Sequence, residues 1–269
     1  MICGRNRLET GSMAAWARAF TANTAVRTVK MVQNGIRQDG IIELLTSGLA
    51  HCGKLQVLDL QDNTFTFTGT AALCTTLPSW PELSELGVGD CLLSARGGVL
   101  LGQKLAEGKN REVQVLRAQY NEIDARGVKA IQQAAEVGLP RLRRVEVNGN
   151  KFAEDDEGVE GLRLLLQERK DKAGEETEKD SGEEDWGLDS LSDLEEEDSD
   201  DEASPPPSPP SPSSPSQPEV KKEDEDEGQK EKERERIVVE AQQAENQPVA
   251  ERKDEDVDKL AEKLGETHV

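Results

Sequence analysis

The side chains that could carry catalytic chemistry are few in this chain of 269 residues. Its two histidines are His51 and His268, and histidine is the residue whose ordinary pKa lies closest to neutral pH. No nucleophile stands beside a base in a recognisable motif, and the sequence has no glycine-rich phosphate-binding loop. We therefore expect no catalytic residues, and a regulator or binding protein rather than an enzyme.

The cysteines do not predict a metal site either. They lack the closely paired spacing of zinc ligands, and each lies among apolar residues: Cys3, Cys52, Cys74 and Cys91. We interpret them as reduced core residues of a cytosolic or nuclear protein. No metal and no cofactor are expected.

The chemistry must then come from a surface, and a repeated sequence pattern determines which surface that is. In residues 55–65, Leu55, Leu58, Leu60 and Phe65 are apolar and Asn63 stands among them, which is the pattern of a leucine-rich repeat. The same arrangement recurs at residues 26–36, 83–93, 113–123 and 142–152, and a partial copy covers residues 1–8. One position of each copy, 28 to 30 residues from the next, is nearly always asparagine: Asn6, Asn34, Asn63, Cys91, Asn121 and Asn150.

This period predicts an α/β fold, a leucine-rich-repeat solenoid of the 28–29-residue type found in ribonuclease inhibitors. Each unit should contain a short strand and then a helix, so that parallel strands line the inner face and helices the outer face over residues 1–170, in about six units of which the first is partial. Helices are expected at residues 11–23, 68–77, 94–107, 125–137 and 154–170. A buried asparagine carries donors and an acceptor, so this position should form a ladder that satisfies the turning backbone.

The alternation of strand residues identifies the side chains on the inner face. We expect Ile2, Lys30, Asp59, Gly87, Arg117 and Glu146 to point outward from the strands. The rim, defined here as the segment around each ladder position, should present Arg5, Arg7, Gln33, Asp62, Asp90, Tyr120, Glu122 and Lys151. Because these side chains carry both signs of charge, the rim suits a protein partner better than nucleic acid.

The last hundred residues have a different composition. Residues 1–170 have a net charge of +1, whereas residues 171–269 have a net charge of −23. We expect this second part to be a mostly disordered acidic tail. Within residues 171–202, Trp186, Leu188, Leu191 and Leu194 stand among the acids; solvated coil is the default interpretation, and a short motif that docks on a basic partner is the alternative.

Two further features concern the ends of the chain. Residue 1 enters directly at the strand of a repeat, although solenoids need terminal units that cover the core, so we expect an N-terminal portion to be missing through truncation or a misplaced start codon. In the tail, four Ser-Pro pairs suggest phosphorylation by proline-directed kinases, at Ser204, Ser208, Ser211 and Ser214.

Residues 1 to about 170 resemble the fungal Ran GTPase-activating proteins. The similarity is most specific in six segments: residues 2–9, 30–37, 58–65, 90–97, 119–123 and 148–152. It implies a GTPase activator rather than an enzyme, whose rim holds GTP-bound Ran, together with a Ran-binding protein, and orders the GTPase's own glutamine and attacking water. It also implies a role in nucleocytoplasmic transport, a cytoplasmic and perinuclear location, and a monomeric state. Independently of the resemblance, we expect no membrane span, because the longest apolar runs are far too short.

The resemblance also assigns site residues. Arg7 and Asp62 match rim positions that meet Ran, and Arg5 and Lys30 are their neighbours. Members of this family have further repeats ahead of this point, which contribute to activation, so we expect this chain alone to bind Ran weakly and to activate it poorly or not at all. The alternative function is a non-catalytic leucine-rich scaffold whose acidic tail binds basic proteins such as histones. The repeat length favours the activator, because acidic histone binders of this class use shorter units.

Overall fold

The structure is a computed structural model that describes residues 1–176 and 186–194. All described residues belong to one compact unit. The expectations for the Ser-Pro pairs, and for most of the acidic tail, lie outside the described residues. No helix among the described residues is both long enough and apolar enough to cross a membrane.

The chain alternates strands and helices. The strands are β1 Thr28–Lys30, β2 Val57–Asp59, β3 Glu85–Gly87, β4 Val115–Arg117, β5 Arg144–Glu146 and β6 Gly187–Leu188. The helices are α1 Met13–Ala22, α2 Gln38–Glu43, α3 Thr66–Thr76, α4 Ser94–Ala106, α5 Ala125–Val137 and α6 Glu157–Glu176. After α2 the chain continues through a π turn, Leu44–Gly48, and a 3-10 turn, Leu49–His51.

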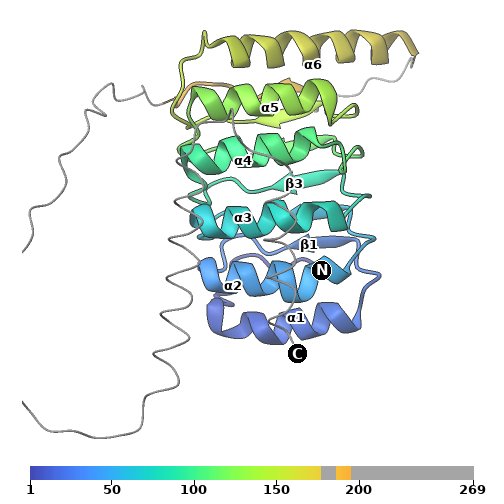
Figure 1. Cartoon of the computed structure of the whole chain (residues 1–269), viewed down its shortest axis with the longest axis vertical. Coiled ribbons are helices and arrows are strands. Elements are labelled where there is room, and N and C mark those ends of the chain that lie inside the picture. The colour runs from blue at the N-terminus through green and yellow to red at the C-terminus, as the bar shows by residue number, and fades with distance from the viewer. Residues whose placement is uncertain (177–185, 195–269) are drawn as a thin grey trace, which may run out of the picture. The chain divides into compact units, whose positions relative to one another are not determined.

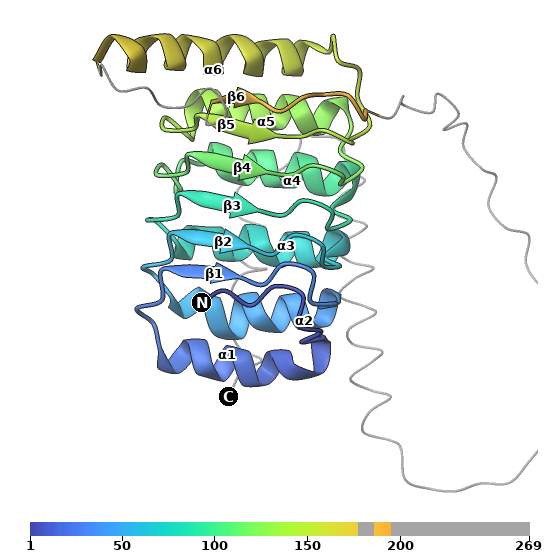
Figure 2. The same ribbon diagram turned by 180° about the vertical axis from the view of Figure 1, so that it is seen from behind.

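The six strands form one parallel sheet in sequence order, β1 to β6 (Figures 1 and 2). From β1 to β5 the register repeats without a shift, so that Val29, Leu58, Leu86, Leu116 and Val145 lie side by side. Before β1, Ile2 forms a single parallel bridge with Lys30. The leucine-rich-repeat solenoid expected from the period is therefore confirmed, with one strand per repeat and each helix behind the sheet.

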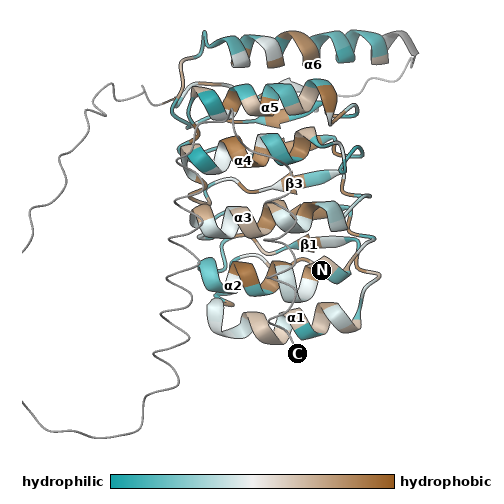
Figure 3. Ribbon diagram, viewed as in Figure 1, coloured by the Kyte–Doolittle hydropathy of each residue, from teal (hydrophilic) through white to brown (hydrophobic). Residues whose placement is uncertain are grey.

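The core lies between the sheet and the helices. The central residue of each of β1 to β5 is fully buried, and the helices contribute Met13, Phe20, Leu73, Leu101, Ile131 and Leu162 from their inner sides. The helices α4, α5 and α6 accordingly carry both hydrophobic and hydrophilic turns in Figure 3. Among the described residues, no helix lies over the opposite side of the sheet, which we call the open face (Figure 2).

The C-terminal part of the unit differs from the expectation in two ways. Helix α6 begins three residues later than expected and continues past Lys170 to Glu176. Residues 186–194 are not solvated coil: Gly187 and Leu188 pair with β5 as an added parallel strand, and Leu188, Leu191 and Leu194 pack against the core. This corrects the default interpretation of this stretch.

Candidate partner-binding rim

Asparagine side chains connect consecutive repeats at the ladder positions. The Asn63 Oδ1 atom accepts hydrogen bonds from the backbone N–H groups of Asn34 and Ile36, at 3.2 and 3.1 Å. Its Nδ2 group donates to the carbonyls of Met31 and Leu60, both at 2.9 Å. Asn121 and Asn150 make equivalent contacts, so the turns after β1, β3 and β4 are each held by an asparagine side chain of the next repeat.

Cys91 replaces asparagine in this ladder. Its Sγ lies 3.4 Å from the carbonyl oxygen of Leu60 and 3.3 Å from that of Gly89, where it can donate one weak hydrogen bond. Burial raises the pKa of the Cys91 thiol to about 12, so the thiol stays protonated at neutral pH. Asn6, the first ladder residue, is exposed. Its backbone N–H donates to the Asn34 Oδ1 atom at 3.0 Å, which connects it to the next repeat.

The rim divides into two rows on either side of the ladder. The residues directly before the ladder positions all have a left-handed backbone, with φ between 50° and 67°: Arg5, Gln33, Asp62, Asp90, Tyr120 and Gly149. Each non-glycine member donates its N–H to a carbonyl of the next repeat, as Arg5 does to Val32 at 2.9 Å and Asp62 to Gly89 at 3.0 Å. The backbone therefore presents one side chain per repeat in a fixed direction.

This left-handed conformation is costly for residues other than glycine, by roughly 1–2 kcal/mol per residue. Arg5, Gln33 and Tyr120 have no side-chain reason to prefer it, so the surrounding repeats must impose it. Backbone strain of this kind concentrates at binding and catalytic sites. The conformation is one reason to treat this row as the functional part of the surface.

The four predicted Ran-contacting residues occupy three parts of the surface. Arg5 and Asp62 share the row before the ladder, two repeats apart, which corresponds to about 10 Å because neighbouring strands lie about 4.8 Å apart. Arg7 lies in the row after the ladder; it is exposed and also has a left-handed backbone, with φ of 49°. Lys30 lies on the open face, beside Asp59 in the sheet register. Their contact with Ran stays a prediction.

The middle of the rim is acidic. Burial is the main reason that the pKa of Asp62 lies above its usual range, and the charge and hydrogen bonding of Asp90 raise it further. Arg5 acts in the opposite direction and lowers the pKa of Asp62. Over the first four repeats the surface therefore changes from basic at Arg5, Arg7 and Lys30 to acidic at Asp62 and Asp90.

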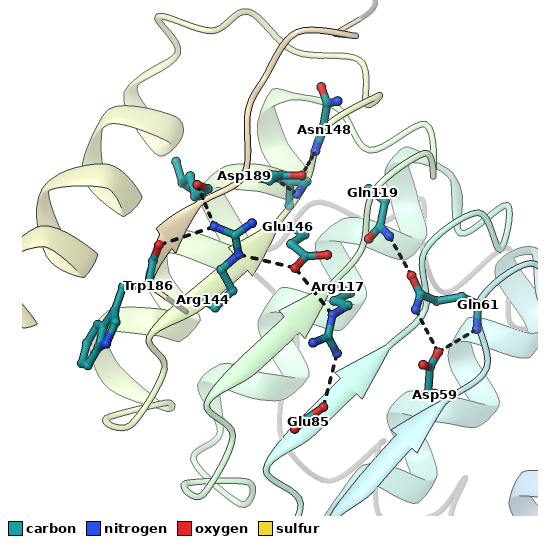
Figure 4. A network of polar contacts seen from close by, with 12 residues as sticks. Asp59, Gln61, Glu85, Arg117, Gln119, Arg144, Glu146, Asn148, Trp186 and Asp189 are labelled. Carbon is teal, nitrogen blue, oxygen red and sulfur yellow. Dashed lines mark hydrogen bonds and ion pairs between the residues drawn. The ribbon is translucent and has the colours of Figure 1, made fainter. Parts of the chain in front are cut away.

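The open face carries a continuous set of polar contacts that sequence reasoning missed (Figure 4). The Gln119 Nε2 group donates to the Gln61 Oε1 atom at 2.7 Å, and the Gln61 Nε2 group donates to the Asp59 Oδ1 atom at 2.9 Å. Gln61 and Gln119 lie two repeats apart, and they meet because Gly89 stands between them. A Cβ atom at Gly89 would come within 2.6 Å of the Gln119 side chain.

A second set of contacts on the open face joins the last repeats. Arg117 lies between Glu85 and Glu146, at 3.4 and 3.5 Å, and Arg144 contacts Glu146 at 3.4 Å. Arg144 also donates to the carbonyls of Trp186 and Leu188 in the added strand. Because Arg117, Glu146 and Arg144 have partners within the chain, the open face of the last repeats offers fewer free charges than the rim near Arg5 and Arg7.

The described residues contain no group of three or more histidine, cysteine or acidic side chains placed to hold a metal ion. Two buried thiols, Cys74 and Cys91, have pKa values raised to about 12 by burial, which removes them as nucleophiles at neutral pH. The rim can bind a partner whose charges complement a basic patch at Arg5 and Arg7 beside an acidic patch at Asp62 and Asp90.

Comparison with known proteins gives one informative relative. Over 165 residues the chain is 39% identical to Ran GTPase-activating protein 1 of Saccharomyces cerevisiae, a match that covers 60% of this chain and 40% of that protein. The resemblance noted from the repeat segments is thereby confirmed, and the chain spans less than half the length of this relative. No protein-family model matches the chain.

Among solved structures, an internalin from Listeria monocytogenes is similar at a TM-score of 0.38 and 14% identity, over 66% of this chain and 36% of the internalin. A likeness at that level carries no argument about this chain.

Proposed function

We propose that this chain activates GTP hydrolysis by the small GTPase Ran. The observation that carries the proposal is the 39% identity over 165 residues to a Ran GTPase-activating protein. In this proposal the chain binds Ran in its GTP-bound form along the rim and orders Ran's own glutamine and attacking water, without supplying an arginine finger. The chain would then be a regulator of nucleocytoplasmic transport, acting in the cytoplasm and near the nuclear envelope.

The geometry of the rim supports this mechanism. An activator that orders another protein's catalytic groups must itself be rigid, because misplacement by about 1 Å can cost about 100-fold in rate. The rim meets this condition: each non-glycine residue before a ladder position is fixed by a backbone hydrogen bond to the next repeat, and the ladder asparagines hold the turn from beneath. The adjacent basic and acidic patches favour a single binding orientation for a partner that carries both signs of charge.

The direct test is single-turnover GTP hydrolysis by purified Ran, with and without an excess of the full chain. We expect acceleration by the chain, and a reduced effect with Arg7→Ala and with Asp62→Asn. Arg18→Ala is a matched control, because Arg18 is also exposed but lies on helix α1, behind the sheet. It should behave like the unmodified chain.

Binding should be measured in parallel, by fluorescence titration of Ran loaded with a labelled GTP analogue. Each rim substitution removes one polar contact and is expected to weaken binding by about 0.5–1.5 kcal/mol. Binding without any acceleration would contradict the activator proposal and leave the chain as a Ran-binding module. If neither binding nor acceleration occurred, while a basic protein such as a histone bound tightly, the scaffold would become the better hypothesis.

A further inference from the structure

Residues 186–194, which we call the docked segment, lie against the last repeat as an added strand (Figure 2). The Gly187 N–H donates to the Arg143 carbonyl at 2.8 Å, and the Asp189 N–H donates to the Val145 carbonyl at 3.1 Å. Three leucines of the segment are partly buried against the core: Leu188, Leu191 and Leu194. The segment therefore occupies the edge of β5 in the way that an extended peptide binds to a sheet by strand addition.

Two carboxylates fasten this segment. The Asp189 side chain accepts hydrogen bonds from the backbone N–H groups of Val147 and Asn148, at 2.9 and 3.0 Å. The Asp193 Oδ2 atom accepts from the Tyr120 hydroxyl at 2.8 Å and from the Asn148 Nδ2 group at 3.1 Å, and the Asp193 N–H donates to the Asn148 Oδ1 atom at 2.9 Å. Asp193 thus connects the segment directly to the rim.

Tyr120 is held in this contact by the neighbouring repeat. Its ring lies over Gly149, where an added Cβ atom would come within 2.1 Å of the ring. Gly149 is also left-handed, with φ of 67°. Because no side chain stands at this position, the tyrosine hydroxyl reaches across it to Asp193. While the segment is docked, this rim residue is engaged within the chain.

A guanidinium group adds contacts to the backbone of the segment. Arg144 donates to the carbonyl oxygens of Trp186 and Leu188, at 3.4 and 3.2 Å, and Glu146 holds it at 3.4 Å (Figure 4). These bonds go to main-chain atoms, so they are open to any extended chain on the edge of β5. Selectivity for one sequence must then come from the leucines and the carboxylates.

The docked segment does not fill its site. A cavity of about 320 Å³ remains between α6 and the segment, and Ser190 lines it. The Ser190 side chain is exposed, and its hydroxyl has no hydrogen-bond partner among the described residues. On the α6 side the cavity is lined by polar residues spaced four and three apart, and so on one face of the helix: Arg163, Gln167 and Lys170.

One cation of this cavity lacks a carboxylate partner. The Lys170 side chain is half-buried and makes no ion pair with any residue that the structure describes. Arg163 already contacts Glu154, at 3.4 Å, and Asp189, the other acid of the cavity wall, accepts from two backbone N–H groups. An acidic side chain in place of Ser190 would therefore meet Lys170 in a partly enclosed space, where a charge-assisted hydrogen bond is stronger than at an open surface.

We propose that the edge of β5 is a peptide-binding site, which the docked segment occupies in place of a partner. The partner is an extended segment of another protein that matches Leu188, Asp189 and Leu191 and carries an acidic residue at the position of Ser190. Because the docked segment belongs to the same chain, its effective concentration at the site is on the order of millimolar, so a partner must bind more tightly to displace it. The contact with Lys170 gives such a partner its advantage.

A second copy of this chain is a poorer occupant than such a partner. Its own segment also has serine at position 190, so it would leave the cavity as empty as the tethered segment does. Association of two chains would cost translational and rotational entropy in addition, without any new contact at the site.

The test measures binding of a labelled peptide to a full chain whose own segment is loosened. The loosened chain carries Asp189→Ala and Asp193→Ala, which remove both carboxylate contacts, and circular dichroism checks that it stays folded. The probe is a fluorescein-labelled peptide with the sequence of residues 186–194, followed by fluorescence anisotropy. We expect it to bind the loosened chain about tenfold more tightly than the unmodified chain, because the tethered competitor is weakened.

A second peptide, which carries Ser190→Glu, tests the cavity. We expect it to bind both the loosened and the unmodified chain about five- to tenfold more tightly than the first peptide, because its carboxylate pairs with Lys170. Lys170→Ala should abolish this gain. Lys172→Ala is the matched control: Lys172 also lies on α6, but it contacts Glu168 at 2.6 Å and is outside the lining of the cavity, so the gain should persist.

Three results would overturn the proposal. Equal binding of the first peptide to the loosened and the unmodified chain, or no saturable binding to either, would show that the edge of β5 takes no peptide from another molecule. Equal affinities of the two peptides, or a gain that survives Lys170→Ala, would exclude the acidic residue from the description of the partner. A dimer of the unmodified chain in light scattering that the loosened chain no longer forms would assign the site to a second copy. None of these measurements requires Ran, so they are independent of the proposed function.

Discussion

At the scale of single residues, the ladder positions combine the most contacts with the least exposure. Asn34, Asn63, Asn121 and Asn150 are all buried, and their amides satisfy backbone groups of two or three repeats. An alanine at such a position would leave several buried N–H and C=O groups without partners, and each carries a desolvation cost.

Asn63→Ala should therefore destabilise the unit. Because the N–H groups of Asn34 and Ile36 lose their acceptor, we expect a decrease of about 1–3 kcal/mol in the free energy of unfolding, measured by urea denaturation followed by circular dichroism. Asn6→Ala is the control: Asn6 is exposed, so its effect should stay within about 0.5 kcal/mol. Equal midpoints for Asn63→Ala and the unmodified chain would refute the structural role of the ladder.

The acidic pair on the rim gives a prediction about pH. Since Asp90 is one of the causes that raise the pKa of Asp62, Asp90→Asn should bring that pKa down toward its usual range. A carboxyl group whose pKa is raised by folding stabilises the folded state when it is protonated. Its contribution to the free energy of unfolding is therefore lost as the pH rises through its pKa in the folded state. Asp90→Asn should therefore reduce the stability that the chain loses as the pH rises through the pKa of Asp62.

A carbon NMR titration of the Asp62 carboxyl group measures the effect directly. Asp39→Asn is the control, because Asp39 is exposed on α2 and is not among the groups that shift Asp62. An Asp62 pKa that is the same with and without Asp90 would show that burial alone causes the shift.

At the scale of elements, the fit between Tyr120 and Gly149 couples the last two repeats and the docked segment. Gly149→Ala should be destabilising for two reasons: the left-handed backbone disfavours a side chain, and the new Cβ would collide with the Tyr120 ring. We expect a loss of about 1–3 kcal/mol in thermal or urea unfolding.

Gly174→Ala is a matched control for this substitution. Gly174 lies in α6 with no atom within 4 Å of an added Cβ, so alanine should be neutral or stabilising by about 0.5–1 kcal/mol, as expected for a helix interior. If both substitutions had the same effect, the contact between Tyr120 and Gly149 would not be a structural constraint.

Elements also show where sequence reasoning succeeds and where it stops. The helix expected at residues 125–137 is observed with those bounds, because apolar residues at helical spacing and the Asp124 side chain, which accepts from the Gly127 N–H, specify it locally. The predicted end of the last helix, α6, at Lys170 is wrong, because the change in composition at that point does not end a helix. The residues that follow, Asp171 and Lys172, are tolerated in an exposed helix.

The docked segment and the left-handed rim could not be found in this way. Asp189 accepts hydrogen bonds from residues 41 and 42 positions earlier, and nothing local in the sequence indicates such a pairing. Likewise, Arg5, Gln33 and Tyr120 are not residues that prefer a positive φ; the repeat imposes it on them. The contact of Gln61 with Gln119 depends in the same way on a glycine in the repeat between them.

At the scale of the whole unit, one continuous core runs from Met13 in α1 to Leu166 in α6. Consecutive repeats pack against one another along this core, and the interfaces between them bury most of the apolar residues. Trp80 is fully buried in the middle of this core, and its indole N–H donates to the Leu49 carbonyl at 2.8 Å.

We therefore expect residues 1–176 to unfold in one transition. The change in tryptophan fluorescence, to which Trp16, Trp80 and Trp186 all contribute, should coincide with the loss of helical circular dichroism in urea. The same should hold for Leu162→Ala, which should be less stable by about 2–5 kcal/mol because it leaves a cavity at the C-terminal end. Separate transitions for the two probes would show that the ends of the solenoid unfold independently.

The docked segment also has a mechanical consequence. It is joined to the sheet by a short parallel pairing at β5 and to the core by three partly buried leucines, whereas β1 to β5 are joined by longer pairings, the ladder and the core together. A pulling force applied through the C-terminal residues would meet this pairing first and detach it before it reached any complete repeat. Tension on the tail would therefore detach the segment and free Tyr120 while the repeats stayed folded.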